Sequence, residues 1–145
     1  MDDFLKQYES HLKAVAKANA LNKPIVFDAL AAAGLTLVEV EFDGEGDSGQ
    51  IEGVYAYAGD ALAALPESSL ILHQAAQNKR DPKTTTVSLN DAIKILCYDY
   101  LSQTHDGWEN NDGAYGTFTF DVRERSIWLD FNERFTDSTH HSHDF

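Results

Sequence analysis

The chain has 145 residues, a length typical of one domain with a sizeable core, and a formal net charge of −13. Its hydrophobic content of 43% excludes a disordered chain, and no apolar run approaches the roughly 20 residues that cross a bilayer. A single cysteine, Cys97, excludes an internal disulfide and a multi-cysteine metal site. The acidic start, MDDFLKQYES, lacks the layout of a signal peptide. We therefore expect a single-domain cytoplasmic protein (residues 1–145).

The acidic charge narrows the choice of partners. A strongly negative protein repels the phosphate backbone of nucleic acids and is attracted to basic surfaces, including those of nucleic-acid-binding proteins. We expect a basic protein partner, with no direct binding to nucleic acid and no membrane. The alternative is that the charge serves solubility alone.

The first 35 residues predict two helices joined as a hairpin. Residues 2–20 place apolar side chains three or four positions apart, as one face of a helix requires. Residues 22–35 predict the second helix, with Asn22 as its N-cap, Pro24 in its first turn and Gly34 as its stop.

Two alternating segments follow and predict a hairpin. In residues 35–42, Val38, Val40 and Phe42 point to one side, and Leu37, Glu39 and Glu41 point to the other. Residues 50–58 predict the second strand. The glycine-rich connection is longer than a two-residue turn, which indicates a bulge or a structured loop.

The next segment, 59–87, predicts a variable insertion of irregular chain, with a short strand or helix near residues 70–76. Residues 89–103 then predict a helix capped by Ser88, with Asp91 at the third position of a capping box. Five apolar residues form one face of this helix, and Cys97 is expected beside them as a buried structural thiol. The five residues are Leu89, Ile93, Leu96, Tyr100 and Leu101.

Residues 115–122 and 126–133 alternate strongly and predict a second hairpin. The core-facing set is Phe118, Phe120, Val122, Ile127, Leu129 and Phe131; the opposite set is Thr117, Thr119, Asp121, Trp128, Asp130 and Asn132. Residues 136–145 are expected to form a flexible tail. The predicted fold is therefore α+β, an antiparallel sheet of about four strands with helices packed on one face.

Three motifs carry a resemblance. The segments VEVEFDGEGDSGQIE (38–52), HDGWENNDGAYGTFTFDV (105–122) and LDFNERFTDS (129–138) resemble a domain-of-unknown-function family of small bacterial, plasmid and phage proteins. The resemblance implies no activity. The positions that match its pattern are Phe42, Gly44, Gly46, Asp47, Ser48, Gly49, Gly107, Trp108, Glu109, Asn111, Gly113 and Gly116.

The first acidic loop is a candidate cation site. Asp43, Glu45 and Asp47 alternate as in the first half of an EF-hand loop, which suggests Ca²⁺ or Mg²⁺. The register then fails, because Ser48 stands where glycine is needed and Val54 where glutamate is needed. A turn in which the Asp47 side chain bonds the backbone is favoured over metal. The chain is too short for the trypsin-like double barrel that GDSG suggests.

The second acidic loop offers further candidates. It carries His105, Asp106, Glu109 and Asp112, with Trp108 expected as a partly buried anchor. If the two loops meet, Asp47, Glu109 and His105 form a candidate acid–base or metal site. The tail adds ligand types, which we interpret as adventitious binders because a flexible end fixes no coordination geometry. They are Asp137, His140, His141, His143 and Asp144.

Two functions compete. The favoured one is a non-catalytic acidic protein-binding module, of the inhibitor kind (anti-defence, anti-CRISPR or immunity type), docking on a basic partner surface. The alternative is a divalent-cation-binding module or small metal-dependent hydrolase that uses both acidic loops. No catalytic residue is predicted. The expected partner-binding residues are Glu39, Glu41, Asp43, Glu45, Asp47, Trp128 and Asp130.

Overall fold

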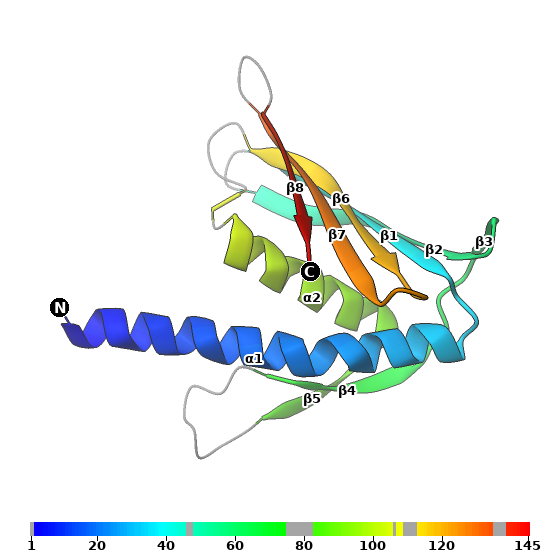
Figure 1. Ribbon diagram of the computed structural model, residues 1–145, viewed down its shortest axis with the longest axis horizontal. Coiled ribbons are helices and arrows are strands. Elements are labelled where there is room, and N and C mark those ends of the chain that lie inside the picture. The colour runs from blue at the N-terminus through cyan, green and yellow to red at the C-terminus, as the bar shows by residue number, and fades with distance from the viewer. Residues whose placement is uncertain (1, 46–47, 75–82, 106, 109–112, 135–138) are drawn as a thin grey trace.

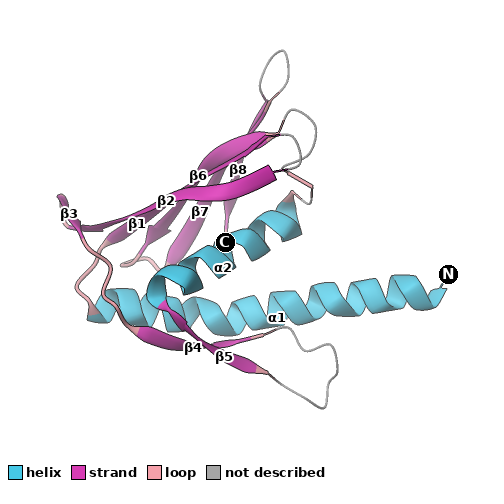
Figure 2. Ribbon diagram, turned by 180° about the vertical axis from the view of Figure 1, so that it is seen from behind, coloured by secondary structure: helices cyan, strands magenta, loops and turns pink. Residues whose placement is uncertain are grey.

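The structure is a computed structural model that describes residues 2–45, 48–74, 83–105, 107–108, 113–134 and 139–145. A large antiparallel sheet is covered on one face by two helices, and a two-stranded sheet lies on the other side of these helices (Figures 1 and 2). The elements are α1 (Asp2–Ala32), β1 (Leu37–Glu45), β2 (Ser48–Ala58), β3 (Ala61–Ala63), β4 (Ser69–His73), β5 (Thr84–Ser88), α2 (Leu89–Thr104), β6 (Ala114–Asp121), β7 (Ser126–Glu133) and β8 (Thr139–Asp144).

The α+β class and the helices on one face are confirmed, but the count of about four strands is wrong. The large sheet has six strands in the order β3-β2-β1-β6-β7-β8. The four inner strands are the two predicted hairpins. The missed strands lie at the two edges, where β3 has three residues and β8 reads THHSHD. Neither alternates between apolar and polar residues, so the sequence pattern does not reveal them.

The expected helical hairpin is wrong, because α1 is one helix of 31 residues that passes through Pro24. Proline lacks the N–H that would bond the preceding turn and therefore weakens a helix. The buried face nevertheless continues across it, from Ala18 to Val26 and Leu30, and packs against the core. This packing outweighs the lost bond. Asn22 is therefore no N-cap but lies inside the helix.

Gly34 ends α1 as predicted. Its φ of 76° lies in the left-handed region, which glycine adopts without a steric cost. The Gly34 N–H donates to the Ala31 carbonyl (3.0 Å), and the Leu35 N–H donates to the Leu30 carbonyl (3.1 Å). Together these bonds form a Schellman motif.

The first hairpin extends further than expected. β1 and β2 pair as far as Glu45 and Ser48, so much of the glycine-rich stretch is strand, and only residues 46–47, outside the described residues, connect the pair. The expected bulge is present farther back. Glu41 pairs with Gly53 and Phe42 with Ile51, which leaves Glu52 as the extra residue of β2.

The 59–87 segment was expected to be irregular, and this is wrong for the part that is described. It contains β3 and the β4–β5 pair, in which Leu70 lies opposite Val87. The short strand expected near 70–76 is β4; residues 75–82 lie outside the described residues. The expected flexible tail is also corrected for residues 139–144, which form β8 and pair with β7.

The core lies between the large sheet and the helices. All six predicted core residues of β6, β7 and the turn between them are buried, as are Val38, Val40 and Phe42 of β1. The five predicted apolar residues of α2 and Cys97 are buried too. Ser88 caps this helix by accepting from the Asp91 N–H (3.1 Å), as predicted. No helix in the described part of the chain is both long and apolar enough to span a membrane.

Candidate functional site

The face of the large sheet that the helices leave uncovered presents aligned rows of side chains. Directly opposite residues of neighbouring strands share a face, so the strand register defines these rows. One row runs Tyr55, Glu39, Thr119, Trp128 and Asp144 across five strands. The adjacent row runs Gly53, Glu41, Thr117, Asp130 and Ser142. We call this surface the open face.

Three aromatic side chains stand exposed on the open face. Tyr55 and Tyr115 are each 40% exposed, and Trp128 is 46% exposed. A Cβ at Gly53 would lie 2.6 Å from the Tyr55 hydroxyl, so the absence of a side chain at Gly53 lets the tyrosine ring lie along its own strand, over the glycine. Exposed tyrosine and tryptophan are the residues that most often anchor protein interfaces.

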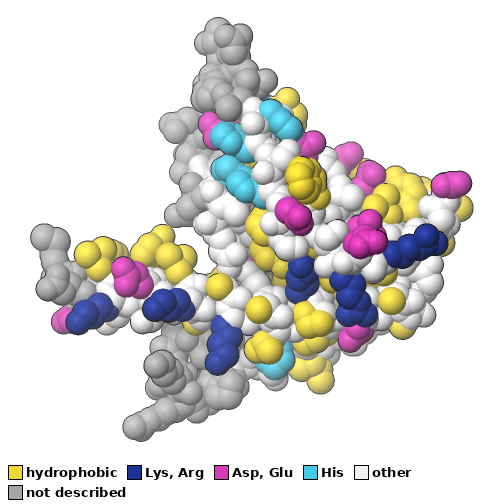
Figure 3. All heavy atoms as spheres, in the orientation of Figure 1, with side chains coloured by type: hydrophobic (Ala, Val, Ile, Leu, Met, Phe, Trp, Pro, Cys, Tyr) yellow, Lys and Arg dark blue, Asp and Glu magenta, His cyan; other side chains and the backbone are white. Residues whose placement is uncertain are grey.

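Carboxylates lie among these aromatic rings. Five of the seven expected partner-binding residues share the open face, namely Glu39, Glu41, Asp43, Trp128 and Asp130. In Figure 3, Asp and Glu side chains are scattered over the part formed by the sheet, and Lys and Arg side chains lie along α1 and again at the right of the view.

Arg134, which the sequence analysis missed, occupies one corner of the open face. Its guanidinium forms an ion pair with Asp43 (2.8 Å), donates to the Gly44 carbonyl (2.9 Å) and lies 4.8 Å from the centre of the Tyr115 ring. Asp43 therefore has a cationic partner within the chain. Of the other predicted loop ligands, Asp47 lies outside the described residues, and the Glu45 side chain is likewise not described. The arginine follows β7 directly and lies within the LDFNERFTDS motif, but it was not among the positions that match the family pattern.

The two acidic motifs do approach each other. Gly44 of the first pairs with Ala114 of the second, and Phe42 packs edge-on against Trp108 with ring centres 5.4 Å apart. Trp108 is half-buried against the core and is thus the anchor that was expected. The proposed grouping of His105 with Asp47 and Glu109 stays a prediction, because the two acids, like Asp106 and Asp112, lie outside the described residues.

A second cluster forms where β8 meets the end of α2. His105 and His143 face each other with their Nε2 atoms 2.7 Å apart, and the His141 ring centre is 5.5 Å from that of His105. Burial lowers the pKa of His105, and His143 and His141 lower it further, while Glu133 opposes the shift. On the other side of β8, His140 contacts Asp130. Within the described residues, no group of three or more acidic, histidine or cysteine side chains is arranged to hold a metal ion.

Helix α2 carries three further titratable groups, of which Cys97 and Tyr100 are buried and Asp99 is half-buried. Burial raises the pKa of the Cys97 thiol well above its usual value, which favours the inert structural role that was expected. Burial also raises the pKa of Asp99 to about 6, and His11 of α1 acts in the opposite direction. The pKa of Tyr100 is raised, first by burial and then by Cys97 and Asp99. None of these groups lines the pocket described next.

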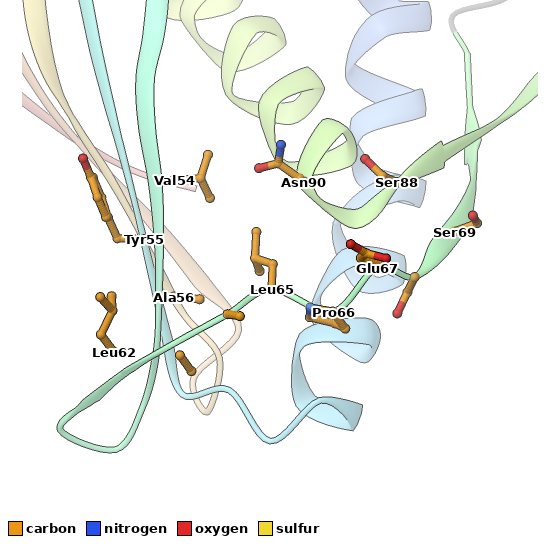
Figure 4. A pocket seen from close by; sticks show the side chains of 13 residues that line it. Val54, Tyr55, Ala56, Leu62, Leu65, Pro66, Glu67, Ser69, Ser88 and Asn90 are labelled. Carbon is orange, nitrogen blue, oxygen red and sulfur yellow. The ribbon is translucent and has the colours of Figure 1, made fainter.

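A shallow pocket of about 510 Å³ lies beside the edge of β2. Its walls come from β2 on one side and the start of α2 on the other, with Leu65 and Pro66 between them (Figure 4). The wall includes Val54, Ala56 and Leu62, and its polar groups include Ser88, which already caps α2. Glu67, Ser68, Ser69 and Asn90 line it too, so the pocket has both apolar and polar walls.

Comparison with known proteins agrees with the resemblance seen in the motifs. No curated protein and no solved structure matches the chain. A family model, described as a family of unknown function (DUF6878), matches residues 18–145. The match covers every strand and α2, whereas the first half of α1, which extends beyond the rest of the molecule, precedes it (Figure 1). The chain therefore belongs to this family of unknown function, DUF6878.

Proposed function

We propose that the protein is a non-catalytic binding module that docks the open face on a basic surface of a partner protein. The observation that carries the proposal is the combination, on one uncovered sheet face, of exposed Tyr55, Tyr115 and Trp128 with the carboxylates of Glu39 and Glu41. Aromatic side chains provide contact area at a low entropy cost, and carboxylates select a cationic partner.

The net charge suggests the class of partner. A chain with a charge of −13 is steered toward cationic surfaces, and proteins that bind nucleic acid present such surfaces. Occupying that surface would block the nucleic acid from binding. The proposed role is therefore inhibitory, against a defence nuclease (anti-CRISPR or related anti-defence type) or against a toxic nuclease (immunity type).

The cation-binding alternative has less support. Its loop needs Asp43 as an oxygen ligand, and this carboxylate is already paired with Arg134 at 2.8 Å. A cation would have to displace the guanidinium. The ion pair with Arg134 therefore favours the binding module over the cation-binding alternative.

A charge-matched pair of variants tests the proposal. Glu39→Lys with Glu41→Lys changes the open face, whereas Asp60→Lys with Glu67→Lys makes the same change of net charge at exposed positions outside it. Both variants and the unmodified protein are used to capture proteins from the extract of the native host at moderate salt. Purified captured protein is then titrated against each variant by calorimetry.

We expect the captured protein to be basic and its affinity to fall at least about 100-fold for the open-face variant, because two attractive charges become repulsive. The control variant should lose less than about 3-fold, through the weaker long-range field alone. Equal losses for the two variants would show that net charge, not the open face, determines binding. Full binding by the open-face variant would refute the proposal outright.

A further inference from the structure

Two imidazole rings, one on a helix end and one on a strand, point their nitrogens into the same space. His105 is the C-cap of α2, and His143 lies on β8, 38 residues later. Their Nε2 atoms are 2.7 Å apart, while their ring centres are 4.7 Å apart and the ring planes are inclined by 72°. Because the nitrogens are much closer than the ring centres, each lies on the side of its ring that faces the other.

Contacts outside the pair hold the His105 ring and the strand that carries His143. The His105 ring is stacked on Phe131, with centres 3.7 Å apart and planes 4° from parallel, and its backbone N–H donates to Leu101 (2.8 Å). The strand that carries His143 is fixed at its end, since Phe145 exchanges backbone hydrogen bonds with Ile127 and its ring stacks on Tyr100. The two donor nitrogens are therefore positioned before any ligand arrives.

A pair of facing imidazole nitrogens has two ways to avoid repulsion between lone pairs. Either one ring carries a proton that it donates to the other, or a cation lies between them. Neutral imidazole is the common ligand of Zn²⁺, Cu²⁺ and Ni²⁺, whereas Mg²⁺ and Ca²⁺ prefer oxygen. We propose that His105 and His143 form a two-histidine site for a divalent transition-metal ion such as Zn²⁺.

The geometry requires only a small adjustment. With Zn–N distances of about 2.0–2.1 Å and tetrahedral angles, the two nitrogens would stand roughly 3.3 Å apart, about 0.6 Å more than now. β8 is the outermost strand and pairs only with β7, so small movements there disturb little else. Water completes the coordination, since no third donor of the described residues converges on the pair.

One carboxylate near the pair would favour a bound cation, although burial and the neighbouring imidazoles disfavour positive charge on His105 itself. Glu133 lies 3.3 Å from the His141 ring nitrogen, and the His141 ring is 5.5 Å from that of His105, which places a carboxylate next to the pair. A bound ion would connect the end of α2 to the edge strand of the sheet. This connection should stabilise the folded state, because the unfolded chain does not hold the two histidines together.

Calorimetry and thermal melting with ZnCl₂ test the site, with MgCl₂ as the reference salt. The variants are His105→Gln and His143→Gln, and the matched control is His140→Gln, on the same strand but on its other face. We expect one Zn²⁺ per chain, a rise in melting temperature with Zn²⁺ alone, and an affinity at least about 10-fold weaker in each pair variant. The control should stay within about 2-fold of the unmodified protein.

A second measurement uses only the unmodified protein, in case a pair variant fails to fold. Nitrogen NMR of the six histidines should show the Nε2 signals of His105 and His143 shifting first, and completing their shift at one equivalent of Zn²⁺. Shifts that begin at His140 or His141, or an equal loss of affinity in the control variant, would mean that exposed histidines of β8 bind the ion adventitiously and would overturn the proposal. The absence of Zn²⁺ binding would overturn it as well.

Discussion

Replacing Asn22 should separate α1 from the small sheet. This side chain is only 2% exposed and mimics a neighbouring strand: its Nδ2 donates to the His73 carbonyl (2.9 Å), and its Oδ1 accepts from the His73 N–H (2.7 Å). Asn22→Ala removes both partners and leaves an N–H and a C=O of β4 without a hydrogen bond in a half-buried position.

The magnitude follows from those two groups. An unsatisfied buried polar group costs about 1–3 kcal/mol; because there are two such groups and His73 is only half-buried, Asn22→Ala should lower the free energy of unfolding by about 2–5 kcal/mol. For a chain of this size, a loss of about 3 kcal/mol lowers the melting temperature by roughly 6–12 °C. Asn22→Asp should be no milder at neutral pH, because a carboxylate oxygen would then face the His73 carbonyl oxygen.

Urea denaturation followed by tryptophan fluorescence measures the loss, and hydrogen exchange of the His73 amide locates it. The matched control is His73→Ala, which keeps the main-chain groups that Asn22 contacts and should cost less than about 1 kcal/mol. The reasoning would be refuted if His73→Ala cost as much as Asn22→Ala, or if the His73 amide remained equally protected in the Asn22 variant.

Three further predictions follow from single positions. Gly116→Ala should cost about 3 kcal/mol or more in thermal melts, because its Cβ would lie 1.9 Å from the Asp130 carbonyl oxygen; a change under 1 kcal/mol would contradict the close packing of β6 and β7. Burial raises the pKa of Asp99 to about 6, above the value of the unfolded chain, so stability should fall as pH rises from about 4 to 6. Asp99→Asn should flatten this dependence on pH and, after allowance for solvent screening, raise the free energy of unfolding by about 1–2 kcal/mol at pH 7.5. A steeper fall of stability with pH in the variant, measured by urea denaturation, would contradict this sign. Cys97 should react with a thiol reagent only as fast as the protein unfolds, and rapid labelling of the native protein would contradict its burial.

The inner part of the sheet could be predicted because each strand has one buried and one solvated face. Val38, Val40 and Phe42 alternate with polar residues, and the same period recurs in β6 and β7. That alternation also placed Glu39 and Trp128 correctly on the open face. The helix α2 was predictable for a similar reason, since Ser88 and the apolar spacing are local features.

The edges of the fold could not be predicted in this way. β8 is made largely of histidine and other polar residues, and its pairing with β7 comes from backbone hydrogen bonds and from Phe145 packing in the core. Similarly, α1 passes through Pro24 because distant residues cover its buried face. These are long-range contacts, and no local spacing in the sequence records them.

The residues of the candidate sites differ in the same way: some follow from the local sequence pattern, and others depend on long-range contacts. The sequence alone determined the acidic charge, the alternating strands and hence the carboxylates and tryptophan of the open face. Only the tertiary structure decided that Arg134 neutralises Asp43 and that His105 faces His143, because each pair joins residues 38 or more positions apart. Charge and periodicity belong to the chain itself, whereas which side chains become partners depends on how the strands and helices pack.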